Sequence, residues 1–595
     1  MVGRSAAKVL RNQELVSIIL EHLRPLDTPG RTRSFGFTLP SWPSGESMSS
    51  FRSTCYSVAR VCKALTEPAL DALWADLPDF KHLLFILHAF VPVDDVQPLS
   101  YMLRGPINSL APDWMRFQEY AVRVRRLPFS DIDPTLNSTV LDQLWSMHRK
   151  PLLPGLQEFR LGSGSTVPKA ISMFISPTLR SVIISDMSAM AIGSLQKPAE
   201  GWDRSDCGTR EVMDTLGAVA ITSFSLRLTP TSSLDTLAVV PRLRDLRVLE
   251  ILSEALPPSS ITSWASVYSR SFSDFSGMCH LHTLTLGLDL DLLFPSSMEL
   301  PPGPSIFLPS LKSVTARGHA GQLNSLLARI DTHQLSSLVF FPFFRVGPLP
   351  DDDDALADIQ SDRSSLGDIF TCLETIGRRV SPSAEAVHIQ LRFNWEPRTG
   401  EAQRPSTSVL DLLRPLLRIK NLRHFTLRIS PLPSLSFDNS DVRVMTSAWR
   451  HIEELSFMPG EQLKSYPTLS ALQWFAHDCR KLRSLTLPVL GLQSLKDLEL
   501  AHHRLGAFPQ EHPLQCLAFC ILARRLDLGT ETIDKASKHI KRYLRALFPL
   551  LKDGHSRLRR TMLDRSVADE NGLMGNDMEK VFIRSVSMVA RGLEV

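Results

Sequence analysis

A short apolar phrase recurs along most of this chain and constrains its fold more than any other feature. The phrase reads apolar-x-x-apolar-x-apolar, and its last four positions alternate as they do in a half-buried β-strand. Eleven copies begin at residues 156, 179, 221, 243, 281, 311, 335, 422, 452, 482 and 514. The longest interval contains VHIQLRF at 387–393, which we expect to be a degenerate copy. Each copy predicts one strand of a repeated structure.

Most of the intervals between copies are 22 to 32 residues long. The recurring Leu-x-x-Leu-x-Leu resembles a leucine-rich repeat, whose regular members have about 20–29 residues. The resemblance implies that each unit adds one strand to a curved parallel sheet with helices outside it. The Asn or Cys that follows the strand in regular repeats is largely missing, because Gly164 and Leu490 stand at that place. We therefore expect an irregular solenoid; the alternative is a conventional mixed α/β domain whose strands begin with Leu.

Three segments whose apolar residues recur at helical spacing precede the repeats, and we call them helical stripes. The first is predicted to begin after Asn12, a residue suited to cap a helix, and to end at Pro25. A loop rich in Pro, Gly and Ser follows, and a second stripe begins near Ser53. The chain restarts around Pro68, which suits a first helical turn, and the third stripe stops before Pro78. On pattern alone, a small helical bundle is the simplest interpretation.

The residues in these stripes carry a second resemblance. NQELVSIILEHL (12–23) and ARVCKALTEPALDALWADL (59–77) resemble the two halves of an F-box, in particular those of large fungal families. The family pattern is an opening Leu-Pro-x-Glu, an aliphatic helix that ends in Leu, a Val-Cys pair and a late Leu-Trp. Arg11 and Asn12 stand where the family often has Leu-Pro, and the insertion between the halves is longer than usual.

In that family the module docks by an apolar helical surface onto a Skp-type adaptor, and the resemblance implies the same partner here. The physical requirement is a hydrophobic patch that the rest of the chain leaves uncovered. The residues that the resemblance assigns to adaptor binding are Leu15, Ile19, Leu20, Leu23, Val61, Cys62, Leu65, Leu73 and Trp74. Some of them are expected to form the internal core instead, Trp74 first among them.

The C-terminal part contains a strongly amphipathic helix, predicted over 532–548. The surrounding residues 523–565 hold 12 Lys and Arg against 5 Asp and Glu, which gives a local charge of +7. We interpret this helix as the solvated cap of the array, and YLRALFPLL also resembles the closing helix of fungal F-box repeat proteins. Contact with nucleic acid or with an acidic partner is the alternative.

Together these features predict an α/β fold made of a short helical F-box, an irregular leucine-rich-repeat solenoid and a C-terminal helical cap. The expected boundaries are 9–80 for the F-box-like module with a disordered insert at about 25–52, 81–150 for a helical linker, 151–528 for the solenoid and 529–595 for the cap and tail.

Several classes of function lack their signatures. The chain has no phosphate-binding Gly-x-x-x-x-Gly-Lys-Ser/Thr loop and no His-Glu-x-x-His zinc helix. Its eight cysteines are scattered, its net charge is only +4, and no apolar stretch approaches the roughly 20 residues of a membrane span. The N-terminus lacks the apolar run and cleavage site of a signal peptide. We expect no catalytic residue, cofactor or metal, no membrane contact, and a cytoplasmic and/or nuclear location.

The sequence thus favours a substrate-recognition subunit of a Skp/cullin/F-box ubiquitin ligase, in which the repeat array holds a protein target. The step from adaptor binding to ubiquitin transfer comes from the resemblance alone. The main alternative is a leucine-rich-repeat scaffold whose N-terminal bundle is only a cap. A hydrolase or transferase hidden in the interval 340–422, and nucleic-acid binding through the basic C-terminal segment, are further alternatives; nucleic acid is the less favoured partner.

Overall fold

The computed structural model divides the chain into two compact units, residues 1–293 and 294–595, each of which is considered by itself. The structure describes residues 12–25, 45–93, 100–105, 108–129, 138–148, 150–161, 169–185, 214–228, 240–253, 275–287, 306–331, 334–344, 370–380, 384–393, 407–430, 435–458, 463–492, 512–523, 530–550, 559–560 and 582–589.

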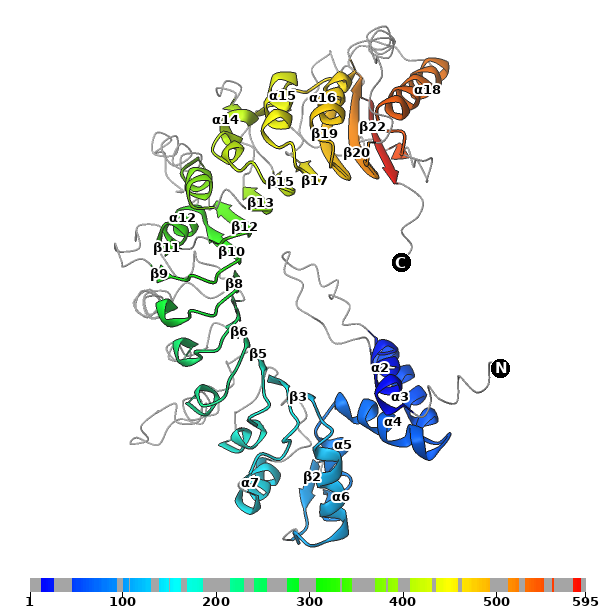
Figure 1. The fold of residues 1–595 in the computed structure, drawn as a ribbon, viewed down its shortest axis with the longest axis vertical. Helices are drawn as coiled ribbons and strands as arrows, with labels where there is room; N and C mark the ends of the chain where they lie inside the picture. The colour runs from blue at the N-terminus through cyan, green and yellow to red at the C-terminus, as the bar shows by residue number, and fades with distance from the viewer. Residues whose placement is uncertain are drawn as a thin grey trace, which may run out of the picture. The chain divides into compact units, whose positions relative to one another are not determined.

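Unit 1 begins with three packed helices, α2 (Gln13–His22), α3 (Gly45–Ala59) and α4 (Lys63–Ala75). The predicted cap of α2 is confirmed, because the Oδ1 atom of Asn12 accepts hydrogen bonds from the backbone N–H groups of Glu14 at 3.1 Å and Leu15 at 3.3 Å. We call α2, α3 and α4 the helical module; Figure 1 draws it in blue.

The second and third helices differ from the prediction at their ends. α3 begins at Gly45 and not near Ser53, so the expected disordered insert is helical over 45–52, while 26–44 lie outside the described residues. The turn between α3 and α4 falls at residues 60–62, where the backbone of Cys62 is extended (φ −162°, ψ 158°). The Oγ1 atom of Thr66 bonds to the carbonyl oxygens of Ala59 at 2.9 Å and Cys62 at 3.1 Å. This turn lets α4 start at Lys63 and include Pro68 inside the helix.

Residues 81–150 hold more than the predicted helical linker. The helices are α5 (Lys81–Leu84), α6 (Pro112–Ala121) and α7 (Ser138–Met147). Strands β1 (Phe90–Val93) and β2 (Ser100–Leu103) form an antiparallel pair. Strand β3 (Arg126–Phe129) is itself a repeat strand, parallel to the next one. Its phrase VRRLPF at 124–129 escaped sequence reasoning because Pro128 occupies a strand position that usually favours β-branched residues.

The remaining strands of unit 1 follow β3 in chain order, each parallel to its predecessor. They are β4 (Glu158–Leu161), β5 (Ser181–Ser185), β6 (Ser223–Leu228), β7 (Val248–Ser253) and β8 (Thr283–Gly287), with the 3-10 turns η1 (Lys169–Phe174) and η4 (Phe275–Gly277) between them. One predicted register is wrong. The phrase expected at 243–248 occurs at 246–251, because Val248 pairs with Ser223 and Thr283 at the start of the ladder.

Unit 2 has the same construction. Parallel strands β10 (Ser313–His319), β12 (Ser337–Phe344), β13 (Ala386–Phe393), β15 (His424–Ser430), β17 (Glu454–Met458), β19 (Ser484–Leu492) and β20 (Cys516–Ala523) follow one another. The degenerate copy predicted at 387–393 is confirmed by β13. Strand β22 (Phe582–Val589) lies antiparallel to β20, and β21 (Arg559–Arg560) lies antiparallel to β22.

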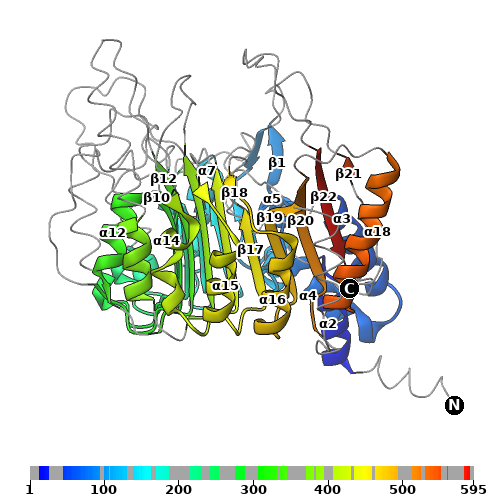
Figure 2. The ribbon, with the colours of Figure 1, turned by 90° about the horizontal axis from the view of Figure 1, so that it is seen from above.

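Helices cover one face of the unit 2 strands (Figures 1 and 2). They are α12 (Ala320–Arg329), α14 (Val409–Leu413), α15 (Asn439–Ala448), α16 (Leu472–Asp478) and α18 (Thr530–Leu547), with 3-10 turns η5 (Leu416–Arg418) and η6 (Leu469–Ala471). Short parallel ladders join β9 (Ile306–Phe307) to β11 (Ile330–Asp331), β14 (Thr407–Ser408) to β16 (Leu435–Ser436), and β16 to β18 (Leu463–Ser465). Both units therefore have the mixed α/β construction of an irregular leucine-rich-repeat-like solenoid.

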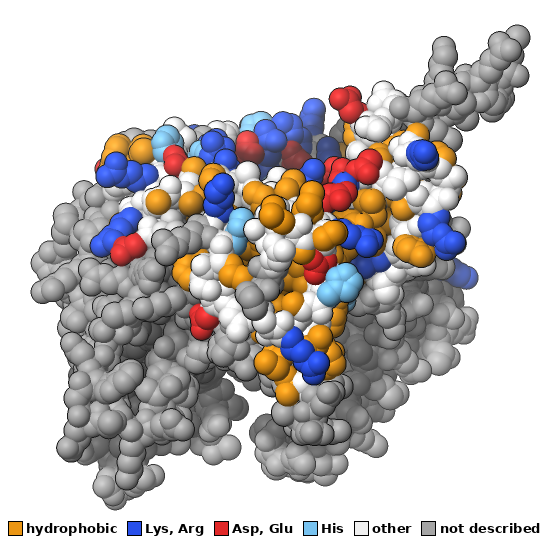
Figure 3. Space-filling model, turned by 90° about the horizontal axis from the view of Figure 1, so that it is seen from below, with side chains coloured by type: hydrophobic (Ala, Val, Ile, Leu, Met, Phe, Trp, Pro, Cys, Tyr) orange, Lys and Arg blue, Asp and Glu red, His pale blue; other side chains and the backbone are white. Residues whose placement is uncertain are grey.

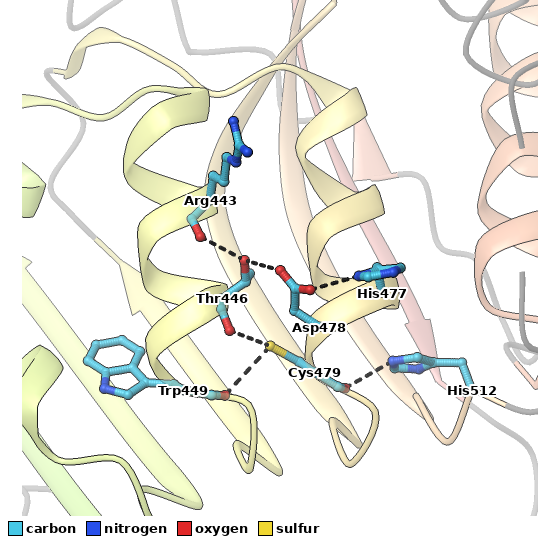
Figure 4. Close-up of polar contacts among 7 residues, drawn as sticks. All are labelled: Arg443, Thr446, Trp449, His477, Asp478, Cys479 and His512. Carbon is cyan, nitrogen blue, oxygen red and sulfur yellow. Dashed lines mark hydrogen bonds and ion pairs between the residues drawn. The ribbon is translucent and has the colours of Figure 1, made fainter.

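The turns that lead into the unit 2 strands contain a polar network in place of an Asn/Cys ladder (Figure 4). The Sγ atom of Cys479 contacts the carbonyl oxygens of Trp449 at 3.7 Å and Thr446 at 3.9 Å, one repeat earlier. Burial raises the pKa of this thiol to about 12, so the thiol is protonated and donates. In turn, Nε2 of His512 lies 3.1 Å from the carbonyl oxygen of Cys479. Consecutive turns are thus tied to one another.

Candidate functional site

Helix α2 carries two apolar faces. Val16 and Leu20, one turn apart, are buried against α3 and α4. A second group of large apolar side chains stays at the surface, with exposed fractions between 40% and 58%. Its members are Leu15, Ile18, Ile19 and Leu23, which we call the α2 stripe. Positions three, four and eight residues apart share one side of a helix, so these side chains form a continuous surface.

The core beneath the α2 stripe is already filled. Cys55 has no exposed surface, and Phe51, Met48, Leu65 and Ala69 pack around it. Burial raises the pKa of the Cys55 thiol to about 11, so this cysteine serves as a small neutral core residue. The helical module already has a filled hydrophobic core, so the side chains of the α2 stripe are not needed to pack it.

The turn between α3 and α4 places a second apolar group at the surface. Val61 is 70% exposed, and Cys62 beside it is also exposed. The hydrogen bonds of Thr66 to Ala59 and Cys62 hold this turn in place. Val61 therefore lies on a turn that hydrogen bonds hold in place, and its side chain faces solvent and contributes little to the core.

The opposite side of the helical module is fastened to the repeats of unit 1. Asp76, which is buried, pairs with Arg24, two residues beyond the end of α2, and its carbonyl oxygen accepts a 2.6 Å hydrogen bond from Arg52 of α3. Asp76 also forms a parallel bridge with Arg126 at the start of β3. On α4, Glu67 pairs with Arg123 at 2.6 Å. These contacts join all three helices to the first repeat and leave the α2 stripe clear of it.

The structure separates the nine residues that the F-box resemblance assigned to adaptor binding. Five are exposed, namely Leu15, Ile19, Leu23, Val61 and Cys62. Leu20 and Leu65 are buried, and Leu73 packs against the core of the module. Trp74 is half-buried and stacks on Tyr120 of α6, with ring centroids 4.6 Å apart. Ile18 belongs to the exposed group but was not assigned; its i+3 spacing from Leu15 was the signal that identifies it.

A second apolar surface lies on α5, β2 and α6 and the residues beside them. Its exposed members are Phe85, Met102, Leu110, Met115 and Val122. Figure 3 shows hydrophobic side chains gathered over the end of unit 1 that carries α5, α6 and β2. On α6 the neighbouring Trp114 and Phe117 are buried, so only one side of this helix faces solvent.

The described residues contain neither a metal-binding cluster nor a helix that could span a membrane. Within those ranges, no group of three or more His, Cys, Asp or Glu side chains is placed to hold a metal ion. None of the helices described has both the length and the apolar composition that a membrane span requires.

Comparison with known proteins gives fold-level similarity only. No family model and no curated protein matches the chain. A chain of the Toll–Spatzle complex, a molecular hub in Drosophila development and innate immunity, is 13% identical with a TM-score of 0.32, over 72% of this chain and 48% of that one. The chain thus spans about half the length of this relative. A chain of the yeast Rad7–Elc1 complex is 9% identical with a TM-score of 0.27, over 78% of this chain and 92% of that one.

Proposed function

We propose that this protein is a substrate-recognition subunit of a Skp/cullin/F-box-type ubiquitin ligase, in which the helical module binds a Skp-type adaptor and the repeats hold a protein target. The observation that carries the proposal is the α2 stripe: four large aliphatic side chains exposed on a module whose core is complete and whose other side is fastened to the repeats. The F-box resemblance of residues 12–23 and 59–77 supplies the identity of the adaptor.

The energetics of the α2 stripe support a protein partner. Burying one Leu or Ile side chain contributes about 1.5–3 kcal/mol relative to leaving it in water. Four such side chains on adjacent turns are the kind of aliphatic anchor that forms the centre of a protein interface, with Val61 on the neighbouring turn as a further contact.

The repeats would supply the target-binding surface. Parallel strands in chain order present an extended face, which suits a protein segment better than a small enclosed substrate. In this proposal the chain carries no catalytic residue. Ubiquitin transfer follows from proximity, because holding a target lysine near the loaded conjugating enzyme raises its effective concentration.

The decisive experiment measures binding of the full chain to a recombinant Skp-type adaptor by isothermal titration or surface plasmon resonance. The test variant is Ile19→Asp with Leu23→Asp, since both side chains are exposed and the substitutions spare the core. Leu20 is unsuitable, because a buried aspartate there would unfold the module. We expect the double variant to lose at least about tenfold in affinity while its circular dichroism and melting temperature stay unchanged.

A matched control is Met115→Asp, an equally exposed apolar side chain on α6. It should bind the adaptor like the natural chain. Absence of adaptor binding by the natural chain, or equal loss in the control, would contradict the proposal.

The second candidate function is a protein-binding scaffold without ligase association. The apolar surface on α5, β2 and α6 favours it, because that surface lies outside the helical module. A chain that fails to bind the adaptor, yet captures a protein partner in a manner abolished by Met115→Asp, would support the scaffold.

A further inference from the structure

Basic side chains concentrate on three adjacent turns of unit 2, those that lead into β15, β17 and β19. Residues 420–423, 450–453 and 480–483 contain Lys420, Arg423, Arg450, Arg480, Lys481 and Arg483 against the single acid Glu453, a net charge of +5. We call these six cations the basic ridge. All six are exposed.

The repeat geometry brings these residues together. Lys420, Arg450 and Arg480 each stand two residues before the first apolar residue of a repeat, at 422, 452 and 482. The ladder pairs His424 with Glu454 and Glu454 with Ser484, so the three turns are in register. Neighbouring strands are about 4.8 Å apart, and the cations therefore repeat at roughly that spacing where the strands begin. Figure 4 shows the turns after Trp449, Cys479 and His512 side by side.

Few acids neutralise the ridge. Arg423 lies 3.6 Å from Glu385 and 3.9 Å from Glu453. Among the described residues, the other five cations of the ridge form no ion pair. Like charges at this spacing repel one another, and the cost is tolerable at the surface only because water screens it. An acidic partner would remove that repulsion.

Helix α18 continues the positive surface beyond β20. Residues 535–548 contain five Lys and Arg and no acid. The ring of Phe548, just after the helix, packs edge-on against His512 with centroids 5.0 Å apart, and His512 bonds to the carbonyl oxygen of Cys479. The end of α18 is therefore anchored at the same edge as the ridge, and Arg542 is exposed there.

The repeat fold does not require basic residues at the turns that lead into its strands. The equivalent turns of unit 1, residues 122–125, 154–157, 177–180, 219–222, 244–247 and 279–282, contain five Arg and one Asp, a net charge of +4 over six turns. The ridge carries +5 over three turns, so its charge per turn is more than twice that of unit 1, and this density belongs to the surface and not to the repeat pattern.

We propose that the basic ridge, together with the end of α18, binds a short acidic segment of a protein partner. Three turns and one helix width span about 20 Å, which corresponds to roughly six residues of extended peptide. A peptide fits better than nucleic acid, because the described residues of the three turns expose no Phe, Tyr or Trp on which bases stack, and Glu453 interrupts the row. The inference that such acidic segments mark the targets of the ligase rests on the proposed function. Binding of an acidic segment to the ridge does not depend on that function.

The test uses the full chain and a fluorescein-labelled peptide that contains six consecutive glutamates flanked by Gly and Ser, measured by fluorescence anisotropy. We expect saturable binding that weakens as salt rises from about 50 to about 200 mM. Arg450→Glu with Lys481→Glu should weaken binding at least about tenfold. The matched control, Arg244→Glu with Lys312→Glu, reverses the same number of exposed charges outside the ridge and should change the affinity by less than about twofold.

The inference is overturned if the peptide does not bind saturably, or if both double variants lose affinity equally. It is also overturned if a single-stranded RNA of equal charge binds more tightly and depends on Arg450 and Lys481, which would assign the ridge to nucleic acid. Adaptor binding separates this result from the proposed function. The ridge variant should keep full adaptor affinity, and Ile19→Asp with Leu23→Asp should keep full peptide affinity.

Discussion

Trp74 of α4 stacks on Tyr120 of α6, with ring centroids 4.6 Å apart and an interplanar angle of 25°. The pair lies between the helical module and the first repeat, close in sequence to the ion pairs that Arg123 forms with Glu67 and Asp71. The tryptophan that the F-box resemblance assigned to an adaptor thus packs against α6 of this chain.

We therefore expect Trp74→Ala to weaken the attachment of the helical module to the rest of unit 1. The adaptor-binding surface on the α2 stripe should stay intact. Loss of the half-buried ring and its stacking should lower the stability of unit 1 by about 2–4 kcal/mol. Thermal unfolding and limited proteolysis would measure this loss, with Trp74→Phe as the conservative control that retains a ring. Adaptor affinity per folded molecule should remain that of the natural chain, and a specific tenfold loss there would place Trp74 at the partner interface instead.

Much of the fold could be predicted from periodicity. The repeat phrase located the parallel strands, including β13, since alternation of apolar residues is a property of the strand itself. Two failures have local causes. Pro128 obscured β3, and residues 243–251 contain the phrase twice, three residues apart, so that only pairing with β6 and β8 selects the register.

The candidate site was less predictable, because exposure depends on which neighbour covers a helix. Ile19 and Leu20 are adjacent on α2, and both are aliphatic, yet Leu20 is buried by α4 and Ile19 is not. The basic ridge could not be predicted from the sequence either. Lys420, Arg450 and Arg480 are 30 residues apart in sequence, and only the parallel register of β15, β17 and β19 brings them together.

Gly155 is required by a close backbone approach. A Cβ atom on Gly155 would overlap the carbonyl oxygen of Val122, the residue that caps the C-terminal end of α6. Gly155→Ala should destabilise unit 1 by about 1–3 kcal/mol, since backbone on both sides must shift. Gly277→Ala is the matched control, because a Cβ there meets nothing within 4 Å. Urea unfolding of both variants would measure the difference in the free energy of unfolding. Equal stabilities would show that the backbone at Val122 can shift without an energetic cost.

The hydroxyl of Thr446 links two repeats and should contribute to the stability of unit 2. Its Oγ1 atom lies 3.1 Å from Oδ2 of Asp478 and 3.1 Å from the carbonyl oxygen of Arg443 (Figure 4). Thr446→Val keeps the shape but removes the donor, and a cost of about 1–3 kcal/mol is expected. Ser447→Ala removes an exposed hydroxyl whose one hydrogen bond among the described residues goes to the carbonyl oxygen of Val444, and it should cost less than about 0.5 kcal/mol in the same denaturation assay.

His512 is expected to make the stability of unit 2 depend on pH. Burial lowers its pKa below the ordinary value of 6.5. The neutral ring suits its surroundings, since Nε2 faces the carbonyl oxygen of Cys479 and Nδ1 accepts the N–H of Leu514 at 3.3 Å. Protonation would remove that acceptor and place a charge in the core.

The sign of the effect follows from proton binding. Below pH 6.5 the unfolded chain takes up a proton at this histidine while the folded chain does not, so stability falls as the pH drops toward the folded-state pKa. The slope contributed by one group is at most about 1.4 kcal/mol per pH unit. Denaturant midpoints between about pH 7.5 and 5.5 should therefore decrease. His512→Gln should flatten this dependence, and identical slopes in the natural chain and the variant would show that His512 titrates normally in the folded state.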